Sequence, residues 1–429
     1  MKSSYYLLCL LFISSSLQAQ EKLTLRQAFE KALKKSEVIA IKGEDIRIAE
    51  GHYLQAWGEV LPHIDVKATE FIQDTSGNSS GSAFSDSFTR RSKPEVAITA
   101  SQPIFQGLRE YYALSTSGAE KRKNVFLKRR AQELLFSDVT KTYYSVIELQ
   151  HEHDILKSLL DATQKRVKEI SERIRLGKSR QSEVLVAESQ QSSLEADIQK
   201  SASQLAISQE LLSYFIGEPL TQELVDEFNV PDSLPNLEKS ISAAQERSDI
   251  KAQEEAVRLA KGKVGYERGA HLPDVRLGAN YYPYRVGFQQ DIKWDMMFTA
   301  KLPIFSGGAT AGRVKEAKAM MKQAEFASAE KKRTAEKEIR QALASLDASQ
   351  KREKFLKQAE SKSGQNYQAQ VDEYRLGLVN NLEVLQSLKD WQQLRLQANL
   401  SHYQTKLDFL NLKVTEGHLP IVEDLLVKP

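Results

Sequence analysis

Cysteine, proline and long apolar runs are scarce in this chain of 429 residues. The only cysteine is Cys9, so the mature protein is expected to have neither a disulfide framework nor thiol chemistry. The 11 prolines and 20 glycines are few and clustered, which leaves long stretches that can be continuous helix. Beyond the N-terminus no run reaches the roughly 18 consecutive apolar residues of a membrane-spanning helix, so none is expected.

The motifs of common enzyme classes are missing as well. The sequence has no Gly-rich phosphate loop, no HExxH pair and no nucleophile elbow. His151 and His153 lie two residues apart in a predicted helix, so they point to different faces and make a poor metal pair. The net charge of +3, with both signs interleaved, does not indicate a nucleic-acid partner. We therefore predict a protein that is not an enzyme and holds no cofactor or metal.

The N-terminus has the pattern of a secretory signal peptide. Lys2 precedes an apolar stretch at 5–13, and small and polar residues then lead to Ala19. This order predicts a signal peptide over 1–19. Four apolar residues follow Cys9, whereas a lipid-accepting cysteine would end the apolar stretch, so a cleaved signal is favoured over a lipid anchor. The protein is predicted to be exported, most simply by a bacterium.

Helical and strand periods alternate along the chain. Apolar residues spaced by three and four predict a helix over 23–59, and a coiled-coil seam predicts a helix of roughly 100 Å over 107–176. Alternation of apolar and polar residues predicts strands near 61–69, 96–105, 272–281 and 291–302. These strands have one apolar and one polar face, as in a membrane barrel, although a soluble sheet packed on a helix has the same pattern.

Aromatic residues gather near the end of the second strand hairpin. An interfacial aromatic girdle of a membrane barrel would lie at such a place. The residues assigned to this predicted girdle are Tyr281, Tyr282, Tyr284 and Trp294.

The chain contains a duplication, marked most clearly by a repeated Arg-Leu-Gly motif. Gly177 and Gly377 each allow the positive φ that ends one long helix and lets the chain double back. Leu61-Pro62 recurs as Leu272-Pro273 at an offset of 211, and the Pro-Ile-Phe of 103–105 recurs at an offset of 200. The offset falls by 11 between the two strands of the hairpin, because the Ser/Gly-rich loop 74–91 of the first hairpin is longer than the corresponding turn of the second. The predicted domains are a first repeat 20–216, a linker 217–235, a second repeat 236–416 and a C-terminal segment 417–429.

The strands also predict self-association. Four strands cannot close in a membrane, because the smallest membrane barrels need about eight and an open edge in lipid leaves backbone groups without partners. The helices carry seams but no globular core, so they require neighbouring copies too. Several copies side by side would form a hollow tube.

The duplicated order of helix, Leu-Pro strand, loop, Pro-Ile-Phe strand, long helix, Arg-Leu-Gly turn and return helix resembles the TolC-type outer-membrane efflux proteins. The resemblance covers essentially the whole mature chain and implies a mainly α fold with membrane β structure. It implies a homotrimer with a 12-stranded outer-membrane β-barrel above a periplasmic α-barrel, in contact with outer-membrane lipid. The implied function is the passive channel of a tripartite efflux or type I secretion system. The alternative is a periplasmic coiled-coil adaptor or scaffold without a pore.

The resemblance also implies partners and roles for the helical turns. The partners are a periplasmic adaptor (membrane fusion protein) and an inner-membrane pump of the RND, ABC or MFS type. In the family the turns form the periplasmic entrance and the adaptor dock. The matching docking residues are Arg175, Leu176, Gly177, Arg375, Leu376 and Gly377.

Acidic residues beyond the second turn line the constriction of such channels. Glu383 matches the first acidic position, Gln386 stands at the second, and Val379 replaces the basic residue that latches the turn. Glu183 is the first-repeat counterpart of Glu383, and the predicted constriction residues are therefore Glu383, Gln386 and Glu183. A ring of identical carboxylates would favour cations. The alternative is that both glutamates only cap the first turn of their helix, where the helix dipole favours negative charge.

Overall fold

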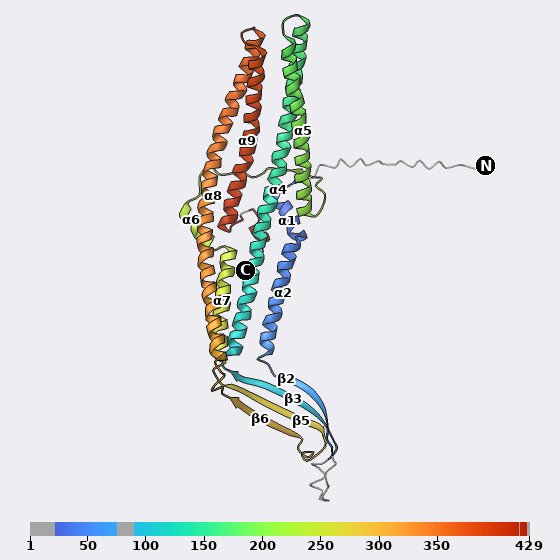
Figure 1. Cartoon of the computed structure of the whole chain (residues 1–429), viewed down its shortest axis with the longest axis vertical. Helices are drawn as coiled ribbons and strands as arrows, with labels where there is room; N and C mark the ends of the chain where they lie inside the picture. The colour runs from blue at the N-terminus through green and yellow to red at the C-terminus, as the bar shows by residue number, and fades with distance from the viewer. Residues whose placement is uncertain (1–21, 75–89, 420, 427–429) are drawn as a thin grey trace, which may run out of the picture. The chain divides into compact units, whose positions relative to one another are not determined.

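The computed structural model describes residues 22–74, 90–419 and 421–426 (Figure 1). The predicted signal peptide 1–19 and most of the loop 74–91 lie outside these residues. The helices are α1 (Leu25–Lys35), α2 (Glu37–Gly58), α4 (Arg109–Arg175), α5 (Gln181–Ile216), α6 (Leu237–Gln245), α7 (Ser248–Gly269), α8 (Ala309–Arg375), α9 (Asn381–Glu416) and the short 3-10 helix η1 (Glu423–Leu425). The strands are β1 (Lys22–Leu23), β2 (His63–Ile72), β3 (Ser92–Gln106), β4 (Glu223–Leu224), β5 (Asp274–Arg285) and β6 (Trp294–Lys301).

The duplication is visible in the lengths of the elements. α4 and α8 each have 67 residues, and the return helices α5 and α9 each have 36. Gly177 and Gly377 have left-handed φ values of 71° and 77° at the two turns. α2 and α7 both have 22 residues and begin 211 positions apart. The two repeats therefore contain the same series of elements.

The compact units of the fold do not coincide with the two repeats. One unit contains the described residues up to Ser36 together with 135–234 and 345–411, and the other contains 37–134, 235–344 and the chain from 412 onward. Each unit thus takes elements from both repeats, and α4 and α8 contribute residues to both units.

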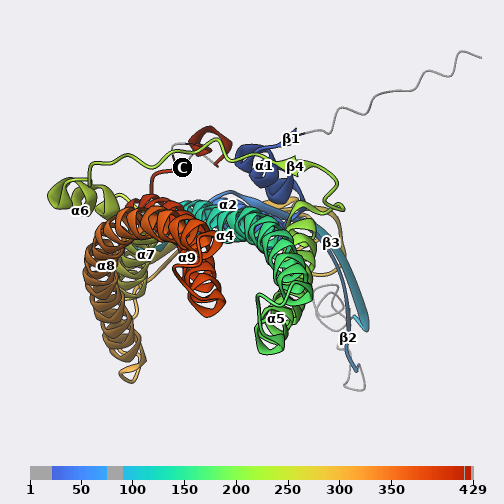
Figure 2. The ribbon, with the colours of Figure 1, turned by 90° about the horizontal axis from the view of Figure 1, so that it is seen from above.

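The first unit is built on the paired ends of the two long helical hairpins (Figures 1 and 2). Leu156 and Leu159 of α4 pack with Leu194 of α5 and Leu388 of α9, so the α4/α5 hairpin contacts the α8/α9 hairpin through an apolar seam. A second cluster closer to the turns includes Ile170, which is fully buried. These seams agree with the coiled-coil spacing of the sequence.

The helix predicted over 23–59 is divided at Ser36. Thr24 caps α1 through a capping box with Gln27, and Leu23 lies in β1, before the helix begins. Ser36 has an extended ψ of 113°, which ends α1 and starts the chain toward α2. The prediction missed the break because the apolar spacing continues across it.

The linker region of the first unit is held by a buried tyrosine. β4 pairs in parallel with β1, and the Tyr143 hydroxyl contacts the carbonyl oxygens of Leu23 at 2.7 Å and Val225 at 2.8 Å. Burial raises the pKa of Tyr143, so the hydroxyl stays protonated and can donate. Lys406 of α9 adds an ion pair to Asp226. The linker is therefore an ordered part of this unit.

The second unit contains a single four-stranded sheet in the order β2-β3-β5-β6. The hairpins β2–β3 and β5–β6 are joined by antiparallel pairing of β3 with β5. β2 and β6 are the two edge strands, and neither outer edge pairs with another described strand. No helix in the described ranges is both long and apolar enough to cross a membrane.

The apolar face of this sheet is open in the single chain. Ile64 and Val66 of β2 are 69% and 74% exposed, and Phe298 of β6 is 67% exposed. A soluble sheet packed on a helix would bury such a face, so that alternative is not what the structure shows. An exposed apolar face of this kind marks an interaction surface.

Candidate functional site: the helical turns and the two faces of the sheet

The two helical turns have the same backbone geometry. In the first, the Gly177 amide donates to Ile174 and the Lys178 amide donates to Arg173, at 2.9 and 2.8 Å. In the second, Gly377 and Leu378 make the equivalent bonds to Tyr374 and Glu373. This pattern is a Schellman motif, which requires the left-handed glycine at its centre. The backbone geometry therefore explains the glycine of the repeated Arg-Leu-Gly motif.

The predicted docking residues are placed differently within these turns. Leu176 and Leu376 are 69% and 76% exposed, so each turn presents a leucine to solvent. Arg175 and Arg375 pair with acidic residues on their own helices, Glu172 and Asp372, both at 3.1 Å. The leucines and the arginines of both turns are therefore exposed and available to a partner, the arginines through ion pairs that lie on the surface.

The two glutamates beyond the turns make different contacts at the starts of their helices. The Glu383 amide donates to the Asn380 side chain at 3.1 Å, and Asn380 donates back to the Glu383 carboxylate at 2.9 Å. Glu183 accepts from Ser179 at 2.7 Å in the first turn. Gln386 donates to Asp390 on its own helix. A capping arrangement is thus present in the second turn, where Asn380 caps α9 through the Glu383 amide, whereas Arg180 at the start of α5 makes no side-chain cap. The carboxylate ring remains a proposal.

A buried arginine that the sequence did not indicate joins the two hairpins near the turns. Arg166 of α4 is 4% exposed and donates to Asn381 at the start of α9, at 3.0 Å. Its guanidinium carbon lies 4.0 Å from the centre of the Tyr374 ring, and Arg173 stacks on that ring at 4.2 Å. Arg166 also pairs with Glu169 at 2.8 Å. We call Arg166, Tyr374 and Asn381 the hairpin latch.

The hairpin latch is not duplicated. The positions 200 residues away from its members are occupied by Asn366, Ile174 and Gln181, which cannot reproduce the stacked cation. Because its partners come from distant parts of the chain, neither spacing nor composition could indicate it. The latch makes the two turns chemically different.

A groove of about 480 Å³ is lined by residues of α4, α5 and α9. Leucines such as Leu159 and Leu385 form its base, and amides and hydroxyls form its walls. Its full lining is Leu156, Leu159, Val186, Ser189, Gln190, Ser193, Leu194, Asp197, Leu382, Leu385, Gln386, Lys389, Gln392, Gln393 and Leu396. An apolar floor with polar walls suits a helix laid along it.

The polar face of the sheet carries a connected set of side chains. Glu95 pairs with Arg285 at 2.8 Å, and the Arg285 guanidinium lies 4.2 Å from the Tyr282 ring centre. The Tyr282 hydroxyl donates to Asp295 at 2.8 Å, and Asn280 donates to the same carboxylate at 2.8 Å. The set links β3, β5 and β6 across one face.

This arrangement corrects one part of the predicted aromatic girdle. Tyr281, Tyr284 and Trp294 are 52%, 54% and 67% exposed, whereas Tyr282 is 7% exposed and lies on the polar face. Val96 pairs with Tyr284 and Ile98 with Tyr281, so β5 carries an extra residue there. Such a bulge brings Tyr284 to the face of Tyr281 and leaves Tyr282 on the other. The sequence alternation alone could not show this.

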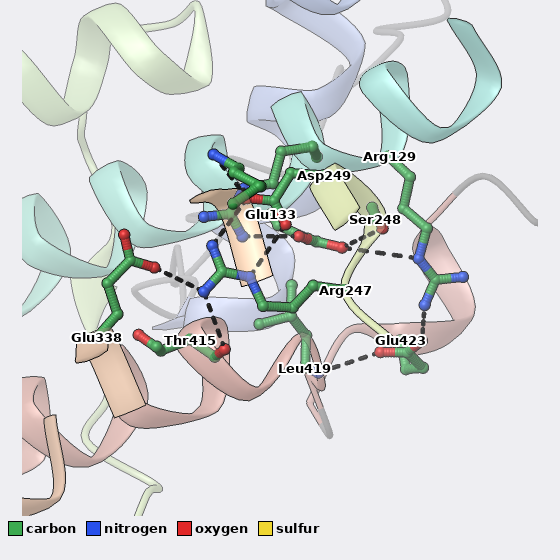
Figure 3. A network of polar contacts seen from close by, with 11 residues as sticks. Arg129, Glu133, Arg247, Ser248, Asp249, Glu338, Thr415, Leu419 and Glu423 are labelled. Carbon is green, nitrogen blue, oxygen red and sulfur yellow. Dashed lines mark hydrogen bonds and ion pairs between the residues drawn. The ribbon is translucent and has the colours of Figure 1, made fainter. Parts of the chain in front are cut away.

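A buried ionic network in the second unit holds the C-terminal segment (Figure 3). Arg247, between α6 and α7, is 2% exposed and binds Asp249 at 2.8 Å, Glu338 of α8 at 2.6 Å and the Thr415 carbonyl. Burial would raise the pKa of Asp249, but the hydrogen bond from Arg247 and the charge of Arg130 lower it to about 2. The carboxylate is therefore ionised at any physiological pH.

The same network reaches the last turns of the chain. Glu133 of α4 is fully buried, accepts from Ser248 at 2.6 Å and pairs with Arg130 at 2.9 Å. Arg129 pairs with Glu423, whose carboxylate also accepts from the Leu419 amide. The network serves to join α4, α7, α8 and the C-terminal segment. No group of three or more potential metal ligands occurs in the part of the chain that the structure describes.

The chain belongs to the outer membrane efflux protein family, whose model matches residues 45–218 and 241–418. The two matched ranges fall on the two repeats. The protein is thus an efflux channel of the bacterial outer membrane, with a large periplasmic helical portion. Proteins of this family typically form trimers that work with adaptor and pump partners.

Solved structures share the fold. A membrane protein from Pseudomonas aeruginosa is 18% identical, with a TM-score of 0.81 and coverage of 93% of this chain and 92% of that chain. VceC from Vibrio cholerae is 18% identical, with a TM-score of 0.79 and coverage of 92% of this chain and 96% of VceC. The Campylobacter jejuni CmeC channel is 17% identical, with a TM-score of 0.78 and coverage of 92% of this chain and 85% of CmeC. They confirm the predicted fold class. No curated protein matches the chain significantly.

Proposed function

We propose that three copies of this chain close their sheets into one barrel and form a passive export channel. The open edges of β2 and β6 carry this proposal, because unpaired strand edges are not tolerated in lipid. Three four-stranded sheets exceed the roughly eight strands of the smallest membrane barrels. The apolar face would contact outer-membrane lipid, and the polar face with Tyr282 and Asp295 would line the water-filled pore.

The helical turns would form the periplasmic entrance. Leu176 and Leu376 would dock the helical tips of a periplasmic adaptor, and the groove lined by α4, α5 and α9 would receive one of its helices. The adaptor would connect the channel to an inner-membrane pump of the RND, ABC or MFS type, for efflux or type I secretion. Because the conduit is passive, the pump would select the cargo.

The hairpin latch would restrain the entrance. Arg166 ties α4 to the second turn through Asn381 and Tyr374, so separating the hairpins would break a buried charged contact. Glu383 would add a ring of three carboxylates if its free edge faces the pore. The latch would thus take the place of the family's basic residue, which is Val379 here.

The assembly can be tested with protein purified from bacterial outer membranes. We expect a trimer in detergent, and a band that migrates differently with and without boiling, as a closed barrel does. A monomer found only in the soluble periplasmic fraction would instead support a coiled-coil scaffold. That alternative leaves the exposed apolar face of the sheet without a role.

A further inference from the structure

The residue pairs of the two strand hairpins are related by two fixed offsets in residue number, which we call the rule. Adding 211 to a position in β2 gives its counterpart in β5, and adding 200 to a position in β3 gives its counterpart in β6. His63 lies opposite Ser101 in the first hairpin, and the rule turns this pair into Asp274 opposite Lys301. That pair is present in the second hairpin. The duplicated chain has therefore kept its strand register.

A second pair confirms the rule at the far end of the hairpins. Thr69 lies opposite Glu95, and the rule gives Asn280 opposite Asp295, which is again the observed pair. The rule therefore describes the whole hairpin.

The junction between the hairpins has a register of its own. Ala100 lies opposite Ala279 and Ser101 lies opposite Gly278, in an uninterrupted run from Thr99 to Pro103 of β3. In a closed ring of copies, β6 would lie beside β2 of the next copy. Because β6 is the counterpart of β3 and β2 is the counterpart of β5, we expect this junction to have the same register as the junction of β3 with β5. The same offsets can therefore be applied to this junction.

From this we propose that β6 pairs antiparallel with β2 of the partner subunit, with Ala300 opposite Ala68 of the partner subunit. The same step places Lys301 opposite Lys67 of the partner subunit. This inference rests on the trimeric assembly proposed above and specifies the register of its seams.

The faces of the strands agree with this register. Ala300 shares the apolar face of β6 with Phe298, and Ala68 shares that of β2 with Val66. Lys301 and Lys67 both lie on the polar faces and both are exposed. A slip by one residue would move one lysine to the lipid side, which the alternation forbids. Only slips by two residues remain as alternatives.

The segment after β6 has no strand beside it in the described single chain, unlike its counterpart in the first repeat. In the first repeat Phe105 pairs with Val275 of β5 and is partly covered. Its counterpart Phe305 is 88% exposed, and Ile304 is 93% exposed. The proposed register continues past Lys301 and brings the start of β2 of the next copy against this segment.

The register creates a basic belt inside the pore. Each seam contributes Lys301 of one subunit and Lys67 of the partner subunit, so a trimer carries six lysines at one level. Lysines placed directly opposite one another repel, so they require the water of the lumen. A ring of lysines favours anions. Asp274 lies opposite Lys301 on the same face, but it pairs with Arg276, so the level keeps an excess of positive charge. The belt would therefore concentrate anionic cargo near this level of the pore.

Engineered disulfides test the register directly. The one native cysteine, Cys9, lies in the predicted signal peptide, so a Cys9→Ser background contains no cysteine. Directly opposite residues in an antiparallel pair have Cα atoms about 4.5–5.5 Å apart, within disulfide range, whereas diagonal neighbours exceed about 7 Å. The Ala68→Cys/Ala300→Cys variant should run as a covalent trimer on a non-reducing gel, at several times the yield of either control. The controls pair Ala300→Cys with Val66→Cys or Glu70→Cys.

Preferential cross-linking of either control pair would overturn the register and leave the trimer intact. The register is likewise overturned if no pair cross-links in trimers that still conduct. A wild-type protein that is monomeric in detergent would instead overturn the proposed function. As a second measurement, Lys67→Glu and Lys301→Glu should each shift the reversal potential in a salt gradient toward cations. An unchanged potential in both variants would contradict the belt.

Discussion

The guanidinium carbon of Arg166 lies 4.0 Å from the centre of the Tyr374 ring, and this contact connects α4 with the end of α8. The same arginine donates to Asn381 at 3.0 Å, so one buried cation contacts both sides of the second turn. Contacts of a buried cation with an aromatic face contribute about 0.5–2 kcal/mol, and hydrogen bonds to charged groups about 1.5–3 kcal/mol. If the turns form the proposed entrance, contacts of this size are strong enough to set how often it opens.

Replacing Tyr374 with leucine should therefore open the channel more often. Loss of the stacking would shift the closed–open equilibrium by about 1.4 kcal/mol, which is a tenfold rise in open probability in planar bilayers. Arg166→Met should act in the same direction. Arg175→Met is the matched control, because Arg175 is exposed and pairs only with Glu172 on its own helix. If Tyr374→Leu and Arg166→Met have the same open probability as the wild type and Arg175→Met, the latch does not gate the pore.

Glu383→Gln separates the two roles of this glutamate. A glutamine amide can still exchange hydrogen bonds with Asn380, so the helix cap is retained while the charge is lost. If the three carboxylates line the pore, block by multivalent cations should weaken about tenfold in the variant. Glu188→Gln, on the exposed side of α5 and away from the turn, is the control. Unchanged cation block in Glu383→Gln would leave the residue as a cap alone.

Glu148 of α4 should make stability depend on pH. Burial, with a smaller effect of Glu152, raises the pKa of Glu148 to about 7. The folded state then holds a proton that the unfolded state loses near pH 4.5, so stability falls as pH rises from about 4.5 through about 7. A glutamine at this position cannot ionise, so Glu148→Gln removes this loss of folding stability at high pH. The melting temperature of the variant should exceed that of the wild type by a few degrees at pH 8, and the gap should shrink at pH 5.

A matched control for that experiment is Glu188→Gln on the exposed side of α5. It should leave the difference between pH 5 and pH 8 unchanged. A gap for Glu148→Gln that is equal at both pH values would contradict the linkage.

Arg247→Met should loosen the C-terminal segment. The variant removes the buried cation that Asp249 and Glu338 share. Because Lys331 still lies 3.0 Å from Asp249 and Glu338 is partly exposed, we expect a loss below the roughly 3–5 kcal/mol of a fully broken buried pair. Limited proteolysis should then cut after residue 411 faster than in the wild type. Arg258→Met is the control, because Arg258 is 64% exposed and its ion pair with Glu255 should contribute less than about 1 kcal/mol. Equal cleavage of both variants would show that the network does not hold the segment.

The fold class could be predicted because its signals are local and repeated. The Arg-Leu-Gly turns, the absence of proline from the long helices and the two-residue period of the strands each follow from neighbouring residues. The position of Tyr282 could not be predicted, because the bulge depends on which residues of β3 lie opposite. The break at Ser36 was hidden by an apolar spacing that continues across it.

Of the candidate site, the sequence predicted the two glycine turns but not the contacts around them. The hairpin latch brings together Arg166, Tyr374 and Asn381, and the Arg247 network joins residues from 129 to 423. Such contacts depend on tertiary packing, and each of these side chains alone resembles an ordinary charged or polar helix residue. A strand register across the seam could be proposed only from the registers that the structure shows within the chain.

Closure of the sheets of several copies into one water-filled pore underlies every role proposed for this chain. The conductance of the purified trimer in a planar lipid bilayer tests that closure without an intermediate step. We expect discrete conductance steps, and a higher open probability for Tyr374→Leu under the same conditions. A stable trimer that inserts into the bilayer and yet passes no ions, in wild type and variant alike, would show that the sheets do not enclose a pore.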